Sequence, residues 1–146
     1  MTVKPIPDGF HTVTPYLVVE DVPRLIDFLK EAFEAVEVER THQPDGSVMH
    51  AEVRIGDSMV MMGQARGEWK AAPVSLYLYV PDVDRVYQQA LAAGAESMME
   101  PQDQFYGDRN GGVKDPQGNT WWIGTRLENL SPEEIQRRAA DYRPQG

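Results

Sequence analysis

The chain of 146 residues contains no cysteine, which excludes disulfide bonds and thiolate metal sites. It also has no apolar run near the ~20 residues that cross a bilayer, so we expect no membrane partner. Residues 1–10 hold one lysine and no apolar stretch of the kind found in secretory signals. We therefore expect a single soluble, cytoplasmic domain.

Basic residues are scarce, with 14 Lys and Arg against 23 Asp and Glu, for a net charge of −9. The basic residues are scattered, and the negative charge repels phosphate backbones, so we expect no nucleic-acid partner. The acidic surface either favours a cationic ligand or simply aids solubility.

A repeat organises the chain at an offset of 61 residues. Leu17-Val-Val-Glu-Asp-Val-Pro-Arg-Leu25 matches Leu78-Tyr-Val-Pro-Asp-Val-Asp-Arg-Val86 at five of nine positions. Each segment is an alternating apolar strand that leads into a helical pattern, with Asp21 and Asp82 as expected N-caps. The same strand-to-helix unit therefore occurs twice.

Three further strands follow each predicted helix, at about 23–33 and 84–93, and turn signals such as Asp115-Pro-Gln-Gly-Asn119 separate them. The expected strands are 36–41, 49–55 and 59–62 in the first unit and 97–100, 110–114 and 120–125 in the second. The pattern predicts an α+β fold of two tandem βαβββ repeats, forming curved mixed sheets around a cleft.

Period-2 alternation predicts which side chains share a face of a strand. In 49–55, Ala51 and Val53 should face the helices, and His50 and Glu52 the opposite side. In the first strand of each unit, Tyr16 and Tyr77 should lie on this opposite side too.

The paired units, the Val-x-Asp-Val after each first strand and the Asp115-Pro-x-Gly-Asn119 turn together resemble the vicinal oxygen chelate superfamily of glyoxalases, bleomycin-resistance proteins and extradiol dioxygenases. The segment from Tyr106 to Ile123 looks like a glyoxalase-like branch. The resemblance covers about residues 11–126, with repeats at about 11–64 and 74–126. It leaves residues 1–10 as an N-terminal extension and 127–146 as a C-terminal helix and tail.

Metalloenzymes of that superfamily take ligands from the first and last strand of each repeat. Counting from Asp21 and Asp115 places these positions at Thr14, Met61, Ser75 and Trp122. None offers an imidazole or a carboxylate, so the resemblance implies that this chain lacks the superfamily's metal, and we expect no cofactor.

His50 and Glu52 project from one strand in the same direction, which suits an acid–base pair or half of a displaced metal site. The alternative is a solvated polar face of the sheet. His11 and His42 lie near strand ends and are interpreted as surface histidines.

Tyr106-Gly-Asp-Arg109 supplies a stacking ring, an acceptor and a bidentate donor, so Tyr106, Asp108 and Arg109 are candidates to anchor a polar ligand. The alternative is a turn whose polar groups satisfy one another. Trp121 and Trp122 must face opposite ways; Trp122 is expected in the cleft, where core packing is the alternative. The predicted ligand-binding surface consists of Thr14, Tyr16, Met61, Ser75, Tyr77, Tyr106, Asp108, Arg109 and Trp122.

Ser131-Pro-Glu-Glu134 is typical of a capping box, so a final exposed helix is expected. It either docks on the body or on a second subunit, or merely caps the domain. The resemblance implies a homodimer with clefts at the joint.

Three functions remain open. The first is a metal-free protein that binds and sequesters a small molecule in an aromatic-lined cleft. The second is a lyase or isomerase of glyoxalase type, either metal-independent and using His50 and Glu52 or carrying a relocated metal site. The third is an interaction module whose cleft is vestigial and filled by Trp122.

Overall fold

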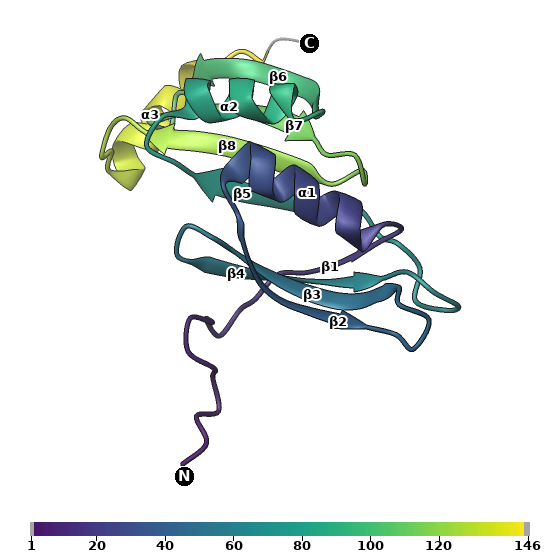
Figure 1. Cartoon of the computed structure of the whole chain (residues 1–146). Helices are drawn as coiled ribbons and strands as arrows, with labels where there is room; N and C mark the ends of the chain where they lie inside the picture. Colours follow the sequence, from purple (N-terminus) through teal and green to yellow (C-terminus); the bar gives the residue numbers. More distant parts are fainter. Residues whose placement is uncertain (1, 145–146) are drawn as a thin grey trace.

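The computed structural model describes residues 2–144; Met1, Gln145 and Gly146, at the ends of the expected N-terminal extension and C-terminal tail, lie outside the described residues. Two four-stranded mixed sheets and three helices form the fold (Figure 1). The predicted α+β architecture of two βαβββ units is confirmed. No helix among residues 2–144 has the length and apolar character needed to span a membrane.

The first module contains one helix, α1, and a sheet in the order β1-β4-β3-β2, with β1 parallel to β4 and the other pairs antiparallel. Its elements are β1 (Tyr16–Val19), α1 (Val22–Phe33), β2 (Val36–His42), β3 (Val48–Ile55) and β4 (Ser58–Gln64).

The second module repeats this order as β5-β8-β7-β6, with the helix α2. Its elements are β5 (Ser75–Tyr79), α2 (Val83–Ala92), β6 (Glu96–Asp103), β7 (Asp108–Lys114) and β8 (Thr120–Arg126). Tyr16 pairs with Met61 across β1 and β4, and Tyr77 pairs with Trp122 across β5 and β8. Both residues of the second pair lie 61 positions after those of the first, so the sequence offset is also a structural one.

Both predicted N-caps are present, because the Asp21 carboxylate accepts from the Arg24 N–H and the Asp82 carboxylate from the Arg85 N–H. The strands mostly extend the predicted ranges by a residue or two. The largest difference is β6, predicted to end at residue 100 but running to Asp103 through Pro101. Proline is tolerated there because β6 is an edge strand and its pairing is irregular between Met99 and Gln102.

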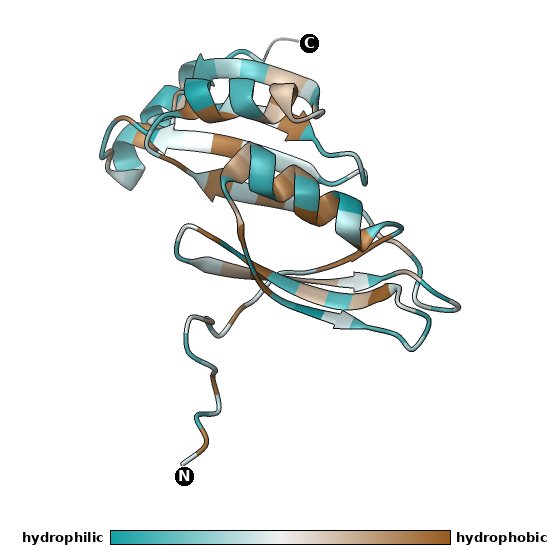
Figure 2. Ribbon diagram, viewed as in Figure 1, coloured by the Kyte–Doolittle hydropathy of each residue, from teal (hydrophilic) through white to brown (hydrophobic). Residues whose placement is uncertain are grey.

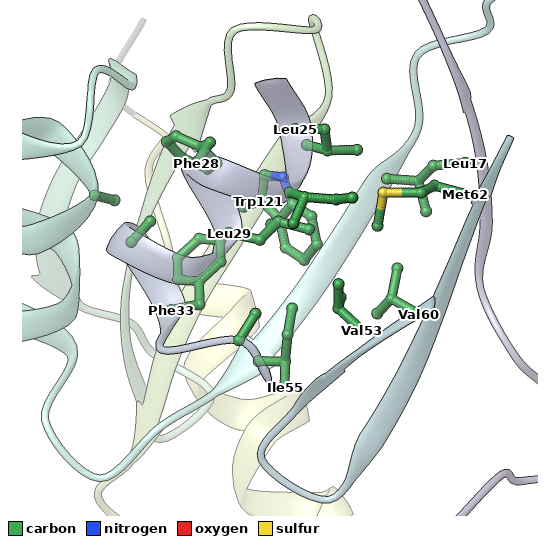
Figure 3. Close-up of a cluster of buried hydrophobic side chains, with 14 of the residues drawn as sticks. Leu17, Leu25, Phe28, Leu29, Phe33, Val53, Ile55, Val60, Met62 and Trp121 are labelled. Carbon is green, nitrogen blue, oxygen red and sulfur yellow. The ribbon is translucent and has the colours of Figure 1, made fainter. Parts of the chain in front are cut away.

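The core lies between the helices and the sheet faces they cover (Figures 1 and 3). Hydrophobic residues of α1 point into it, while the exposed side of the helix is hydrophilic (Figure 2). Trp121 of β8 is 1% exposed and its ring lies 5.1 Å from that of Phe33 in α1. This contact joins the two modules in one core.

The Asp115 turn is built as the sequence predicts and also anchors this core. The Asp115 carboxylate accepts from the indole N–H of Trp121 at 2.8 Å and from the side-chain amide of Asn119 at 3.0 Å. Asn119 is fully buried, so the turn supplies buried polar groups with partners inside the protein.

The third helix, α3 (Pro132–Asp141), begins at Ser131, whose hydroxyl accepts from the Glu134 N–H. The Glu134 carboxylate bonds Arg137 and Arg138 rather than completing a capping box, and these guanidinium groups lower its pKa to about 2. Arg138 also donates to the Phe105 carbonyl and to Glu128. The helix therefore docks on the body of the second module.

Candidate functional site

Each sheet has a helix-free face, on the side away from the shared core. In the second module this face carries Tyr77 and Trp122 from neighbouring strands. Tyr77 is 42% exposed, and a Cβ added at Gly124 would lie 2.9 Å from its ring. A Cβ at Gly112 would lie 2.5 Å from the ring of Trp122. Both rings therefore lie directly over glycine backbone, where a side chain would clash, and together they make an aromatic floor.

A hydrogen-bond network holds one end of this floor. The hydroxyls of Tyr77 and Tyr79 donate to Asp108 Oδ2 at 2.9 and 2.8 Å. Asp108 is 3% exposed, and its Oδ1 has no hydrogen-bond partner among the described residues, although Arg126 Nε lies 3.6 Å away. The buried carboxylate therefore depends on the two tyrosine hydroxyls and on Arg126 for its compensation.

Burial raises the pKa of Tyr77 above the usual range of a phenol, and the bond to Asp108 adds to this while the bond from Asn110 opposes it. The bond to Asp108 is the main cause of a raised pKa for Tyr79. Both hydroxyls therefore remain protonated donors across the physiological range.

Asn110 extends the network toward solvent. Its amide N–H groups donate to the hydroxyls of Tyr77 at 3.0 Å and Tyr106 at 2.7 Å, and its carbonyl accepts from Gln104 at 3.0 Å. The Tyr106 hydroxyl accepts this bond and has no recorded acceptor for its own hydrogen among residues 2–144. It is therefore a donor available to a ligand.

A groove of about 830 Å³ opens over this face. The rings of Phe105 and Tyr142 lie 4.9 Å apart at its edge, tilted by 40°, so the chain after α3 forms one wall. The groove is lined by Tyr77, Met99, Gln102, Asp103, Gln104, Phe105, Tyr106, Asn110, Trp122, Tyr142 and Arg143.

In the first module, Tyr16 lies over Gly63 as Tyr77 lies over Gly124. The neighbouring side chains differ, because His50 of β3 stands where Asn110 stands in β7. The rings of Tyr16 and His50 are 5.8 Å apart, and His50 Nδ1 lies 3.2 Å from Glu39 Oε2 of β2. The sequence suggested His50 and Glu52 as a pair; in the structure Glu39 joins them, so that the cluster has three members.

Of the predicted ligand-binding residues, Tyr77, Tyr106 and Trp122 line the groove, and Asp108 accepts the hydrogen bond of the Tyr77 hydroxyl. Tyr16 and Met61 lie together on the first sheet. Ser75 is on the same side of β5 as Tyr77, outside the groove lining. Thr14 precedes β1 and donates to the His11 carbonyl.

Arg109 lies on the helix-facing side of β7, because its neighbours Asp108 and Asn110 take the opposite side. Its guanidinium makes a bidentate ion pair with Asp84 of α2 at 2.9 Å and bonds Asp103 of β6 at 3.0 Å. These carboxylates raise the pKa of Arg109, and Arg109 lowers that of Asp84. The Tyr-Gly-Asp-Arg motif suggested that the Arg109 side chain would reach a ligand. The alternation of β7 places it on the helix-facing side instead, where it connects β7 to α2.

The predicted site residues did not include Tyr79, Gln104 and Asn110 of the network around Asp108, or Glu39 of the first module. Asn110 follows the singled-out motif directly, and alternation from Asp108 could have placed it on the same face. Tyr79 is likewise in phase with Tyr77. Glu39 carried no usable signal, because a β-bulge between Glu37 and Glu39 changes the phase of β2.

A second groove, of about 780 Å³, lies between the modules, where the end of α1 and the β3–β4 turn meet β5 and the start of α2. Its wall includes Asp82, which caps α2, and Asp57 of the turn. These polar groups already serve the local backbone or neighbouring side chains, so the aromatic groove is the better candidate site.

Two βαβββ modules with a glycine-backed tyrosine on each helix-free face define a paired-repeat protein. Residues 9–123 match the family model described as the glyoxalase/bleomycin resistance protein/dioxygenase superfamily. The chain belongs to this superfamily, as its sequence resemblance implied.

Similar proteins include uncharacterised ones from Mycobacterium bovis and Mycobacterium tuberculosis, each 38% identical over 135 residues. The match covers 85% of this chain and 89% and 79% of those proteins, respectively. Among solved structures, TioX from a Micromonospora species has a TM-score of 0.70 at 24% identity, covering 80% of this chain and 99% of that one. A family enzyme from Burkholderia phytofirmans has a TM-score of 0.66 at 19% identity, covering 78% and 97%. These structures support the fold.

Proposed function

We propose that the protein binds a small, flat, mostly apolar molecule in the groove of the second module. The observation that carries this proposal is the aromatic floor of Tyr77 and Trp122, which lie over Gly124 and Gly112, with Tyr77 also fixed by its bonds to Asp108 and Asn110. Rings held in place before binding lose little conformational entropy when a ligand stacks on them. No reaction is needed for this function.

The polar groups of the groove narrow the class of ligand. The Tyr106 hydroxyl offers a hydrogen, and the amides of Gln102 and Gln104 lie in the same wall. The floor itself carries no free charge, because Asp108 is buried and accepts hydrogen bonds from Tyr77 and Tyr79. A fused-ring ketone or quinone fits this arrangement, since its ring stacks and its carbonyl accepts from Tyr106.

The volume of the groove favours binding over the vestigial-cleft alternative. Sites for small molecules commonly span roughly 300–1,000 Å³, and the groove beside Trp122 is about 830 Å³. Trp122 lies over Gly112 and lines the groove, whose volume remains open beside it.

Tryptophan fluorescence provides the test, because the three tryptophans differ in position. Trp69 is 71% exposed outside the groove, Trp121 is buried, and Trp122 lines the groove. A panel of fused-ring ketones and quinones would be titrated into the W69F variant. We expect saturable quenching by at least one compound, accompanied by a rise in melting temperature.

The same compound should lose at least about tenfold in affinity in W122A and about threefold or more in Y106F, for a lost stack and a lost hydrogen bond respectively. W69F is the matched control and should bind like the unaltered chain. Binding that survives W122A, or a panel in which no compound quenches, would contradict the proposal.

We further propose that two copies pair through the helix-free faces. Tyr16, Val36 and Tyr79 are 50%, 49% and 59% exposed there. A second copy that laid its second-module face over the first-module face would cover these side chains and close the groove. Sedimentation should give a dimer at micromolar concentration and a monomer for Y16E.

Cytoplasmic residence also remains a prediction, which cell fractionation would test.

A second candidate function is acid–base catalysis on the first module. The contact between His50 and Glu39 favours it, since a carboxylate that orients an imidazole is a common catalytic arrangement. On this view Glu39 positions His50, and Glu52 is the second titratable group. Loss of any measured lyase or isomerase activity in H50N, with ligand binding retained, would identify it.

A further inference from the structure

We infer that Glu39, His50 and Glu52 form a binding site for a first-row divalent transition metal, with zinc as the best fit. Each residue offers one ligand atom, and these atoms all lie within 4.8 Å of one another. Among residues 2–144, no other three His, Asp or Glu side chains come together in this way. The site is on the helix-free face of the first module, and its three residues are on other strands than those that form the groove of the second.

The backbone explains how the three side chains meet. His50 and Glu52 alternate onto the same face of β3, and Glu39 pairs directly with Glu52 across β2 and β3. The β-bulge between Glu37 and Glu39 brings Glu39 to this face; Glu37, on the helix-facing side, bonds Lys30 of α1 and Arg40. Bulges commonly redirect a side chain next to a functional site.

The carboxylates of Glu39 and Glu52 lie close enough for a cation between them to be favourable. Two glutamates directly opposite each other in adjacent strands repel, and such pairs destabilise a sheet. His50 lies 3.2 Å from Glu39, while no hydrogen bond to Glu52 is recorded among the described residues. A divalent ion would bind both carboxylates and remove the repulsion between them.

The chemistry of the ligands selects the ion. One imidazole and two carboxylates suit a borderline ion such as zinc more than magnesium or calcium, which prefer oxygen alone. Zinc ligands lie about 2.0–2.2 Å from the metal and so about 3.5 Å from each other. The flexible glutamate side chains can close the small difference by rotation, and water would complete the coordination.

The second module offers an internal comparison. Its structurally equivalent positions, read from the same strand pairings, are Met99, Asn110 and Gly112. The same bulge is present in β6, between Ser97 and Met99. The scaffold is therefore shared, and the imidazole and two carboxylates occur in the first module alone.

The test is a zinc titration of the untagged full chain after chelator treatment and dialysis. We expect one equivalent of zinc to bind, with magnesium giving no response at the same concentration. H50N, E39Q and E52Q should each weaken zinc binding by at least about tenfold, since even the loss of a group behind a ligand costs that much.

The chain provides matched controls for each change. The H11N/H42N double variant removes both other histidines and should bind zinc unchanged. E37Q alters a glutamate on the same strand but on the other face, and should also bind unchanged. Imidazole resonances assigned to His50 should shift when zinc is added to the unaltered chain, a readout that does not depend on how any variant folds.

Zinc binding that is equal in H50N, or no shift of the His50 resonances at one equivalent of zinc, would overturn the inference. Because Trp122 is on the other sheet, the W122A variant should bind zinc as the unaltered chain does. Failure of the groove proposal and failure of the metal site are thus distinguishable in one set of variants.

Discussion

Replacing Gly124 by alanine should destabilise the protein, whereas the equivalent change at Gly63 should not. A Cβ at either position clashes with the hydroxyl end of the tyrosine above it, Tyr77 or Tyr16. Neither glycine has a positive φ, so alanine is compatible with the backbone at both positions. The two substitutions are therefore matched in their local chemistry and differ in what each displaced tyrosine loses.

Displacement of Tyr77 breaks its bond to Asp108 and the bond it accepts from Asn110. A hydrogen bond to a charged group contributes about 1.5–3 kcal/mol and a neutral one about 0.5–1.5 kcal/mol. Alanine recovers about 0.5–1 kcal/mol in a strand, and solvent replaces part of the loss because Tyr77 is 42% exposed. We expect a net cost of about 1–2 kcal/mol for G124A.

The Tyr16 hydroxyl has no recorded hydrogen bond among the described residues, so G63A should change the free energy of unfolding by less than about 0.5 kcal/mol. Urea unfolding monitored by tryptophan fluorescence measures both values, and the melting temperature of G124A should fall by roughly 3–8 °C. Equal effects of the two substitutions would refute the view that the Asp108 network makes Tyr77 rigid.

Two further predictions concern the buried polar groups. In an alkaline absorbance titration, two of the six tyrosines should ionise at higher pH than the others, because the pKa values of Tyr77 and Tyr79 are raised. The stability that these hydroxyls contribute is complete below the unfolded pKa of about 10 and is lost as the pH rises toward the folded value. The Y77F/Y79F variant should reduce this decline, and an unchanged pH profile of stability in that variant would contradict the prediction. D115A should cost about 3 kcal/mol or more, because it leaves the buried Trp121 and Asn119 donors without an acceptor. D45A is the control, since the Asp45 carboxylate bonds only Ser47 on the surface, and its urea midpoint should stay close to that of the unaltered chain; similar midpoints for the two variants would contradict this.

The fold could be predicted because its signals are local and occur twice. The 61-residue offset, the two aspartate caps and the alternation of β3 all describe backbone geometry that neighbouring residues determine. Aromatic residues on the helix-free faces followed from the same alternation, since Tyr16 and Tyr77 are out of phase with the buried residues of their strands.

Alternation could not predict every member of the two clusters or the partners of Arg109. The bulge before Glu39 inserts one residue into the pattern of β2, and no residue type marks it. Arg109 was a candidate to bind a ligand because its motif is rich in polar groups, but its guanidinium bonds Asp103 of β6 and makes a bidentate ion pair with Asp84, on a helix 25 positions earlier. Partners that distant are set by the packing of α2 on the sheet, and a local motif carries no information about them.

The two modules show how one scaffold can support different chemistry on its two faces. Both retain a tyrosine over a glycine and a bulge in the edge strand, which keep three cross-strand positions at the same spacing. Glycine at position 112 leaves room for the Trp122 ring above it and makes an apolar floor, whereas Glu52 at the equivalent position pairs with the smaller Met61 and lies close to His50. The second module therefore has Trp122 and Gly112 where the first module has Met61 and Glu52. If pairing of two copies brings the first-module face of one against the second-module face of the other, the proposed metal and the proposed groove would share one cleft, and zinc should then alter the affinity of a groove ligand only in the dimer.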